Sequence, residues 1–158
     1  MGTPGTGKSA IAKAIAPVLG LSILEINDLV KDQSFFIGYD VFRDSLIIDE
    51  PRICDYLIPI LEKNQQMCLC GPVLELPARL FDLIVVLECN PSILRKRLGA
   101  RGYDIKKIEE NIEAEIMQII AEEARTIYGG RCPISEIDTS DFTPIQVAEL
   151  VIENLKSL

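Results

Sequence analysis

The chain opens on residues that suit the binding of phosphate, in the order Gly2-Thr3-Pro4-Gly5-Thr6-Gly7-Lys8-Ser9. Glycines in the spacing G-x-x-x-x-G-K-S adopt backbone angles that other residues avoid, and they let amide N–H groups come close to phosphate oxygens. Lys8 adds a positive charge. The Ser9 hydroxyl can ligate Mg²⁺ where the next helix begins, and the dipole of that helix favours the same anion. The pattern therefore predicts a site for a nucleoside triphosphate.

The residues after the loop predict the helix that such a site needs. Apolar side chains recur at helical spacing from Ser9 to Leu19, and Gly20 predicts the end of the helix. Pro17 predicts a kink or an early end, because proline removes a backbone hydrogen bond. A chance glycine-rich turn is the weaker alternative, since the required helix follows. The Asn-Lys-x-Asp element of guanine-specific GTPases does not occur, which favours an ATP-using kinase or ATPase.

Three arginines form a second group of candidate functional residues, at Arg95, Arg97 and Arg101. Guanidinium groups over a phosphate site can neutralise the charge of a phosphoryl group in transfer. Arg97 and Arg101 share one helix face if the helix persists that far. A solvated basic face at a helix carboxyl end explains the same residues. The residues alone leave both interpretations open.

The elements that must position these groups alternate between strand and helix. This alternation predicts an α/β fold with a parallel sheet and helices on both faces. Apolar runs predict strands at 22–26, 66–70, 83–87 and 134–137. Periodic segments predict helices at 49–61, 90–97, 105–128 and 143–155, with Asp49, Asn90 and Thr143 as their amino-terminal caps where a cap is evident. A phosphate-binding loop also needs a buried strand leading into it, so we expect the first strand of the sheet to be missing before Gly2 and the sequence to be incomplete.

The composition limits the number of domains, the class of partner and the location that we expect for the protein. A chain of 158 residues fits a single domain, 1–158. Its 24 acidic and 16 basic residues give a net charge of −8, which disfavours direct contact with nucleic acid or an anionic membrane. Five scattered cysteines and no histidine fit neither a disulfide framework nor a zinc site, and no apolar run approaches the length of a membrane span. We therefore expect a cytoplasmic protein, with a nuclear location in addition if the source is eukaryotic.

Short segments along most of the chain resemble those of one family, the adenylate kinase isoenzyme 6 family, also called coilin-interacting nuclear ATPases. The likeness runs without gaps from Gly2 to about Tyr128. The segments that carry it are Asn27-Asp28-Leu29, Gly38-Tyr39-Asp40, Asp49-Glu50, Arg101-Gly102-Tyr103, Lys106-Lys107, Asn111-Ile112, Glu115-Ile116 and Glu122-Glu123-Ala124. An ordinary turn is the alternative explanation for Gly38-Tyr39-Asp40.

The resemblance implies a P-loop fold of the nucleoside monophosphate kinase type. It implies ATP and Mg²⁺ as cofactors, AMP or another nucleoside monophosphate as acceptor, and ATPase activity besides transfer from ATP to AMP. The monophosphate-binding segment is expected at about 25–48 and the lid at about 100–110. Lys8 and Arg101 are the expected catalytic residues, and Ser9 the expected Mg²⁺ ligand. The ATP-binding residues carried over are Gly5, Thr6, Gly7, Lys8, Ser9, Ala10 and Arg101.

Two departures from the family pattern raise a second hypothesis. Lys31 stands where many adenylate kinases have an arginine, and it lacks the bidentate fork of that residue. Leu69-Cys70-Gly71 stands in place of Asp-Tyr-His, so that Leu69 replaces an acid near the magnesium and the nucleophile. Catalysis then needs another carboxylate, and Glu75 is near in sequence. The alternatives are a nucleotide-dependent assembly factor of the small ribosomal subunit, with a basic ribosomal protein as partner and weak or no kinase activity, and an inactive gene product.

Overall fold

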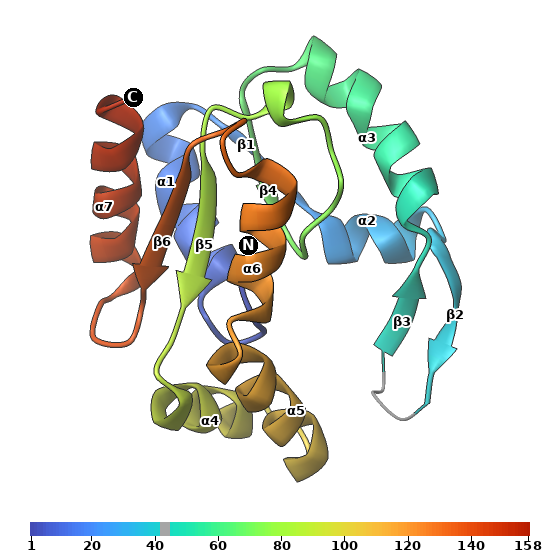
Figure 1. Cartoon of the computed structure of the whole chain (residues 1–158), viewed down its shortest axis with the longest axis vertical. Helices are drawn as coiled ribbons and strands as arrows, with labels where there is room; N and C mark the ends of the chain where they lie inside the picture. The colour runs from blue at the N-terminus through green and yellow to red at the C-terminus, as the bar shows by residue number, and fades with distance from the viewer. Residues whose placement is uncertain (42–44) are drawn as a thin grey trace.

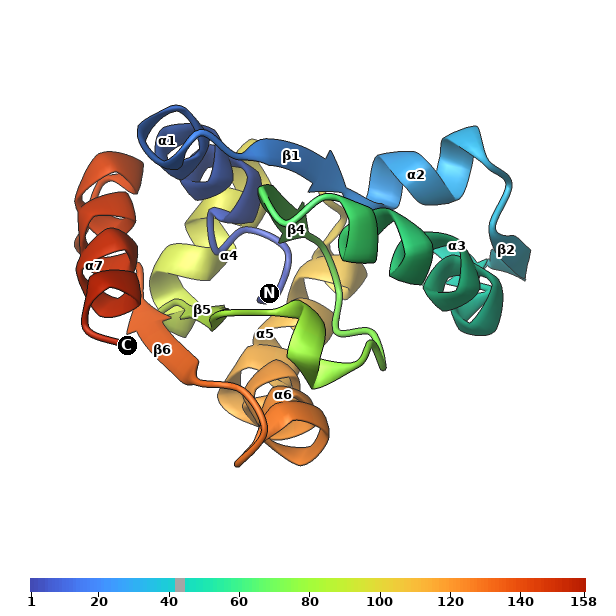
Figure 2. The same ribbon diagram turned by 90° about the horizontal axis from the view of Figure 1, so that it is seen from above.

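A computed structural model of the whole chain describes residues 1–41 and 45–158. Its strands and helices form an α/β fold with two pairs of parallel strands (Figures 1 and 2). β1 (Ser22–Glu25) pairs with β4 (Met67–Cys70), and β5 (Ile84–Glu88) pairs with β6 (Ile134–Asp138). Helices α1 (Lys8–Leu19) and α7 (Pro144–Lys156) pack on one face of β5 and β6, and α6 (Ile119–Tyr128) packs on the other. No helix in the described part is long and apolar enough to cross a membrane.

Alternation along β5 explains why it is covered on both faces. Val85 and Leu87 face the apolar cluster beneath α1 and α7, whereas Ile84 and Val86 face α6. The continuous apolar run is thus typical of a central parallel strand, as the sequence predicted. The amino end of the chain lies beside this strand, between β4 and β5 (Figure 2). Leu87 N donates to the carbonyl of Met1 (3.0 Å), and Gly2 forms a parallel bridge with Leu87.

The two strand pairs are separated along most of their length. Within residues 1–41 and 45–158 no strand lies between β4 and β5, and a cavity of about 520 Å³ occupies this region. Side chains of α1, β4 and β5 line it, among them Ile15, Leu69 and Val85. The amino group of Met1 donates to Val85 O (2.6 Å), and burial lowers the pKa of that amino group to about 6.

A hairpin and two helices project beyond β1 (Figure 1). They are α2 (Ile26–Asp32), β2 (Phe36–Asp40), β3 (Ser45–Ile48) and α3 (Glu50–Lys63). β2 and β3 pair antiparallel, so Gly38-Tyr39-Asp40 lies in a strand and the ordinary turn is excluded. Residues 42–44 of the expected monophosphate-binding segment lie outside the described residues. An apolar cluster centred on Ile26, Ile53 and Leu57 joins α2 to α3.

The long helix predicted at 105–128 is wrong, because the chain turns within it. α5 (Ile105–Ile116) ends before Gln118, which has a left-handed φ of 51°, and α6 then begins. The two helices bury their apolar faces in different places. Ile108 and Ile112 pack against α4 (Pro91–Ala100), whereas Tyr128 of α6 packs against β5. A straight helix could not satisfy both contacts.

The helix ends follow the predicted signals closely. Gly20 ends α1 with a left-handed φ of 67°. The side chains of Asp49 and Asn90 cap α3 and α4, and Thr143 forms a capping box with Gln146 before α7. Pro17, however, does not shorten α1, which continues to Leu19. Pro17 is exposed, so water can solvate the carbonyl that loses its partner. A short 3₁₀ helix, η1 (Ala78–Leu80), completes the described elements.

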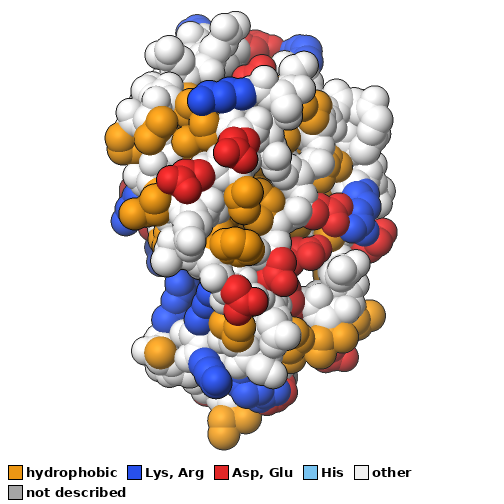
Figure 3. Space-filling view, turned by 90° about the vertical axis from the view of Figure 1, so that its left-hand side faces the viewer, with side chains coloured by type: hydrophobic (Ala, Val, Ile, Leu, Met, Phe, Trp, Pro, Cys, Tyr) orange, Lys and Arg blue, Asp and Glu red, His pale blue; other side chains and the backbone are white. Residues whose placement is uncertain are grey.

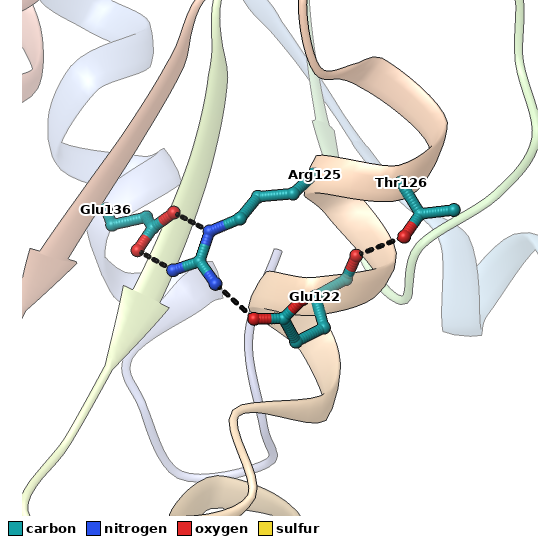
Figure 4. A network of polar contacts seen from close by, with 4 residues as sticks. All are labelled: Glu122, Arg125, Thr126 and Glu136. Atoms are coloured by element: carbon teal, nitrogen blue, oxygen red, sulfur yellow. Dashed lines mark hydrogen bonds and ion pairs between the residues drawn. The ribbon is translucent and has the colours of Figure 1, made fainter.

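Arg125 ties α6 to β6 on the surface (Figure 4). Its guanidinium donates to both carboxylate oxygens of Glu136, at 2.7 and 2.5 Å, and to Glu122 one turn before it (2.6 Å). Thr126 donates to the backbone carbonyl of Glu122 (2.8 Å). The hydrogen bonds with Glu136 raise the pKa of Arg125. This planar contact orients α6 on the sheet edge.

Tyr128 provides a test of the core. Its hydroxyl is buried and donates to Leu74 O (2.5 Å), and burial raises its pKa to about 12. We expect Tyr128→Phe to lower the free energy of unfolding by about 1 to 2 kcal/mol, because the Leu74 carbonyl loses one of its two donors and keeps only the N–H of Leu76. Urea denaturation measures this change. Tyr56→Phe, at a ring that is 39% exposed, is the control, and equal midpoints for the two variants contradict the assignment.

Candidate nucleotide site

The glycine-rich loop is held by an internal hydrogen bond and packs against α4. Gly5 and Gly7 have φ angles of 97° and 102°, where other residues are strained. A Cβ on Gly5 would lie 2.6 Å from a methyl of Leu94, so only glycine fits against α4. The hydroxyl of Thr6 donates to Thr3 O (2.9 Å), and both threonines are buried. The predicted loop is therefore a rigid turn that leads directly into α1.

The amino end of α1 is open to an anion. Gly7 precedes the helix and provides no side-chain cap, so the first backbone N–H groups of α1 are available for a ligand. Ser9 and Ala10 are exposed in the first turn. Lys8 Nζ donates to the carbonyls of Gly2 (2.5 Å) and Thr3 (3.0 Å). Burial lowers the pKa of Lys8, and the charge of Arg101 acts in the same direction.

The side chains of the three arginines make different contacts. Arg95 forms an exposed ion pair with Glu109. Arg97 donates to the carbonyl of Thr139 (2.8 Å) and to its hydroxyl (3.1 Å), which fixes the segment after β6. Arg101 follows α4 and is exposed, and its guanidinium forms no hydrogen bond or ion pair with any described residue. Arg95 and Arg97 thus have partners of their own, whereas the role expected for Arg101 stays a prediction.

A cavity of about 420 Å³ adjoins the loop on the side of α4 and α7. Gly5, Gly7 and Arg101 line it together with Thr139 and Phe142. The aromatic ring and the guanidinium offer flat surfaces on which a planar base can stack. The hydroxyl of Thr139 also donates to the carbonyl of Thr6 (3.0 Å). Sequence reasoning missed Thr139 and Phe142, because nothing in their local pattern indicates that β6 ends beside the loop.

Glu115 of α5 is a further residue of the site that the sequence analysis did not assign. Its Oε2 accepts from the Thr3 hydroxyl (2.5 Å), and its Oε1 accepts from the backbone N–H of Cys89 (2.6 Å). α5 begins within the segment expected to form the lid, at about 100–110, so this carboxylate links that helix to the loop. The only sequence signal was its place in the Glu115-Ile116 segment of the resemblance.

At the end of β4, Cys70 and not Leu69 is the side chain that lies near the glycine-rich loop. Leu69 packs against the apolar cluster of α2 and α3, whereas Cys70 lies beside Ser9, with Sγ and Oγ 3.9 Å apart. Burial raises the pKa of Cys70 to about 11, and a hydrogen bond with Glu25 adds to this effect. The thiol is therefore protonated at neutral pH. Glu75 is exposed and binds Glu50 through its backbone N–H (2.8 Å), so the structure does not bring its side chain to the loop.

The surroundings of Ser9 fit Mg²⁺ that arrives with a nucleotide. Among the described residues, no group of three or more His, Cys, Asp or Glu side chains could hold a metal alone. Mg²⁺ commonly takes only one or two protein oxygens and completes its shell with phosphate and water. Ser9 offers an exposed hydroxyl, and Oε1 of Glu25 is buried without a hydrogen-bond partner in the described part.

The segment expected to bind the monophosphate supplies few charges near its described strands. Lys31 is exposed in the last turn of α2. Ile37 and Tyr39 of β2 and Ile47 of β3 are exposed apolar side chains. The hairpin therefore presents an apolar surface, with Lys31 on the adjoining helix.

Comparison with known proteins agrees with this geometry. Residues 1–118 match a family model described as an AAA domain. The chain is 35% identical to a presumed adenylate kinase of Methanocaldococcus jannaschii, over 98% of this chain and 83% of that protein. It is 42% identical to the adenylate kinase isoenzyme 6 homolog of Schizosaccharomyces pombe, over 80% of this chain and 73% of that protein. The solved deoxyadenosine kinase of M. mycoides with bound dCTP has the same fold, with a TM-score of 0.60, 16% identity, and coverage of 100% and 97% of the two chains.

Lys8 provides the test of the site. We expect Lys8→Ala to weaken ATP binding at least tenfold, on the order of 1.4 kcal/mol, because the phosphates lose the attraction of a cation that is largely withdrawn from water. Fluorescence titration with a labelled ATP analogue measures the dissociation constant. Lys13→Ala, on the exposed side of the same helix, is the matched control. Equal affinities for the two variants would show that the nucleotide binds elsewhere.

Proposed function

We propose a phosphoryl transfer for this chain, which belongs to the adenylate kinase isoenzyme 6 family. The reaction is ATP + AMP to 2 ADP, and ATP hydrolysis accompanies it. The observation that carries the proposal is the position of Arg101, after α4, where it lines a cavity with Gly5 and Gly7 of the loop and its charge acts on Lys8. Two cations from separate elements face one phosphate site, as transfer of a highly charged group requires.

The loop and the start of α1 position the triphosphate. Backbone N–H groups of the loop and Lys8 bind the β and γ phosphates, and Ser9 holds Mg²⁺. When bound, Mg²⁺ neutralises charge on the phosphate oxygens. Lys8 binds the carbonyls of Gly2 and Thr3 in the structure described here, so it exchanges these partners for phosphate oxygens when ATP enters. The ring of Phe142 lies in the cavity beside the loop and offers a flat surface to the base.

Arg101 acts when the lid at about 100–110 closes. Its side chain has no partner among the described residues, so it is available to the phosphoryl group in transfer. Closure also excludes water from the site. Without an acceptor, or with incomplete closure, water takes the phosphoryl group and the reaction becomes ATP hydrolysis.

The acceptor is AMP or another nucleoside monophosphate, bound by the segment at about 25–48. Lys31 supplies one point charge for its phosphate, which predicts weaker binding than a bidentate arginine gives. The exposed apolar side chains of β2 and β3 suit contact with a base.

A second candidate function is nucleotide-dependent assembly of the small ribosomal subunit. The net charge of −8 supports a basic ribosomal protein as the partner. Acidic side chains lie across the face formed by α7 and its neighbours (Figure 3). We expect a basic small-subunit protein to be retained on the immobilised chain with ATP and to be released without it. Retention that is independent of nucleotide, or none at all, contradicts this function.

The kinase proposal is tested by ADP formation. We expect the chain to form ADP from ATP only slowly without AMP and faster with it. Arg101→Ala should lower kcat by about a hundredfold or more, since an arginine on the transferred group contributes effects of this order. Arg95→Ala, which breaks a surface ion pair on the same helix, is the control.

Two outcomes of this assay would overturn the proposal. One is wild-type protein that binds ATP and forms no ADP with AMP or another nucleoside monophosphate. The other is equal kcat for Arg101→Ala and Arg95→Ala, which would remove the guanidinium from the reaction.

A further inference from the structure

We infer that Glu25, the last residue of β1, is the carboxylate that faces Mg²⁺ in the phosphoryl-transfer site and takes the place of the acid absent from β4. The inference rests on the proposed function, because it concerns the same bound nucleotide. It is carried by an unpartnered carboxylate oxygen at the point where β1, β4 and α1 meet.

The register of β1 and β4 places Glu25 on the same face of the sheet as Cys70. β1 and β4 run parallel, with Glu25 opposite Cys70 and Leu24 opposite Leu69. Side chains that are opposite each other in a parallel pair share one face, and successive residues alternate between faces. Leu24 and Leu69 pack into the apolar cluster of α2 and α3. Glu25 and Cys70 therefore lie on the other face, at the carboxyl ends of their strands.

That face carries the phosphate-binding groups. Cys70 lies opposite Glu25, which raises the pKa of its thiol, and Cys70 Sγ lies 3.9 Å from the hydroxyl of Ser9. The charge of Glu25 also acts on Lys8, whose lowered pKa it partly restores. Glu25 thus lies near the cation and the hydroxyl at the start of α1, although Ser9 and Glu25 are 16 positions apart in the sequence.

The carboxylate has a vacant acceptor position. Oε1 of Glu25 is buried, and no described residue donates a hydrogen bond to it. An ionised oxygen withdrawn from water without a partner is costly, so such groups mark places where a ligand completes the contact. Mg²⁺ carried by ATP, with the water that it retains, is a hard cation that prefers such an oxygen. Ser9 and Glu25 would then approach it from α1 and β1.

The other carboxylates near the loop are less suited to this role. Both oxygens of Glu115 accept hydrogen bonds, from Thr3 and from the N–H of Cys89. Glu88 also has an unpartnered buried oxygen, but burial and the nearby carboxylates of Glu136, Glu115 and Asp138 raise its pKa, which disfavours its ionised form. Glu75 is exposed. Glu25 alone of these four combines a vacant oxygen with proximity to Lys8 and Cys70.

The test compares ATP binding with and without the metal. Dissociation constants are measured by titration calorimetry in excess Mg²⁺ and in EDTA, for the wild type, Glu25→Gln and the matched control Glu75→Gln. We expect Glu25→Gln to lose at least tenfold in affinity for ATP with Mg²⁺ and to remain within about twofold of the wild type in EDTA. Glu75→Gln should match the wild type in both conditions. A Glu25→Gln protein with the wild-type dependence on Mg²⁺ overturns the inference.

A second readout separates the metal contact from a structural role. Mn²⁺, followed by its electron paramagnetic resonance signal in the presence of a non-hydrolysable ATP analogue, should bind at least tenfold more weakly to Glu25→Gln. Cys70→Asp in the Glu25→Gln background returns a carboxylate to the same face and should restore most of the Mn²⁺ affinity. If Glu25→Gln does not fold, Glu25→Asp is used, and unchanged Mn²⁺ affinity in that shorter variant counts against the inference.

Failure of this inference is distinguishable from failure of the proposed function. If the wild type binds ATP in neither condition, the proposed function is wrong. If the wild type binds ATP more tightly with Mg²⁺ and Glu25→Gln does the same, only the role of Glu25 is wrong.

Discussion

The close contact between Gly5 and α4 is the constraint on which the site depends. Because Gly5 has no side chain, Leu94 and Leu98 lie directly against the glycine-rich loop, and both leucines are fully buried. This packing fixes the direction of α4 and brings Arg101, which follows the helix, to the cavity beside Gly5 and Gly7. A methyl group at Gly5 would push α4 away from the loop as well as strain the backbone. One glycine therefore sets both the shape of the loop and the position of its distant partner.

Two carboxylates near the loop differ in how far their oxygens are hydrogen-bonded. Both oxygens of Glu115 accept hydrogen bonds that hold the fold, because they join α5 to Thr3 and to the residue after β5. Glu25 keeps one oxygen without a partner and lies beside Cys70. The first arrangement makes the loop rigid before a ligand arrives, which lowers the entropy lost on binding. The second leaves a charge to be satisfied by the ligand, which is how a rigid site can favour a metal-bound nucleotide over a free one.

Much of the fold could be predicted from local patterns. The caps at Asp49, Asn90 and Thr143 and the stop at Gly20 were found because each depends on residues within one turn of the helix end. The hairpin of β2 and β3 was not found as strands, since its exposed apolar residues show no clear alternation. The break at Gln118 was also missed. An unbroken helical period runs through 105–128, and only the separate surfaces that α5 and α6 cover require the turn.

The sequence by itself determined the phosphate-binding loop, the helix after it and the α/β class, because glycine spacing, helix caps and apolar periods act over a few residues. The tertiary structure decided which polar side chains share the site. It placed the guanidinium of Arg97 against the backbone after β6 and left that of Arg101 without a described partner. It also packed the side chain of Leu69 against an apolar cluster and placed Glu25 opposite Cys70. Strand register and helix packing join residues that are distant in the chain. Neither leaves a local pattern in the sequence that could be read before the strands were paired.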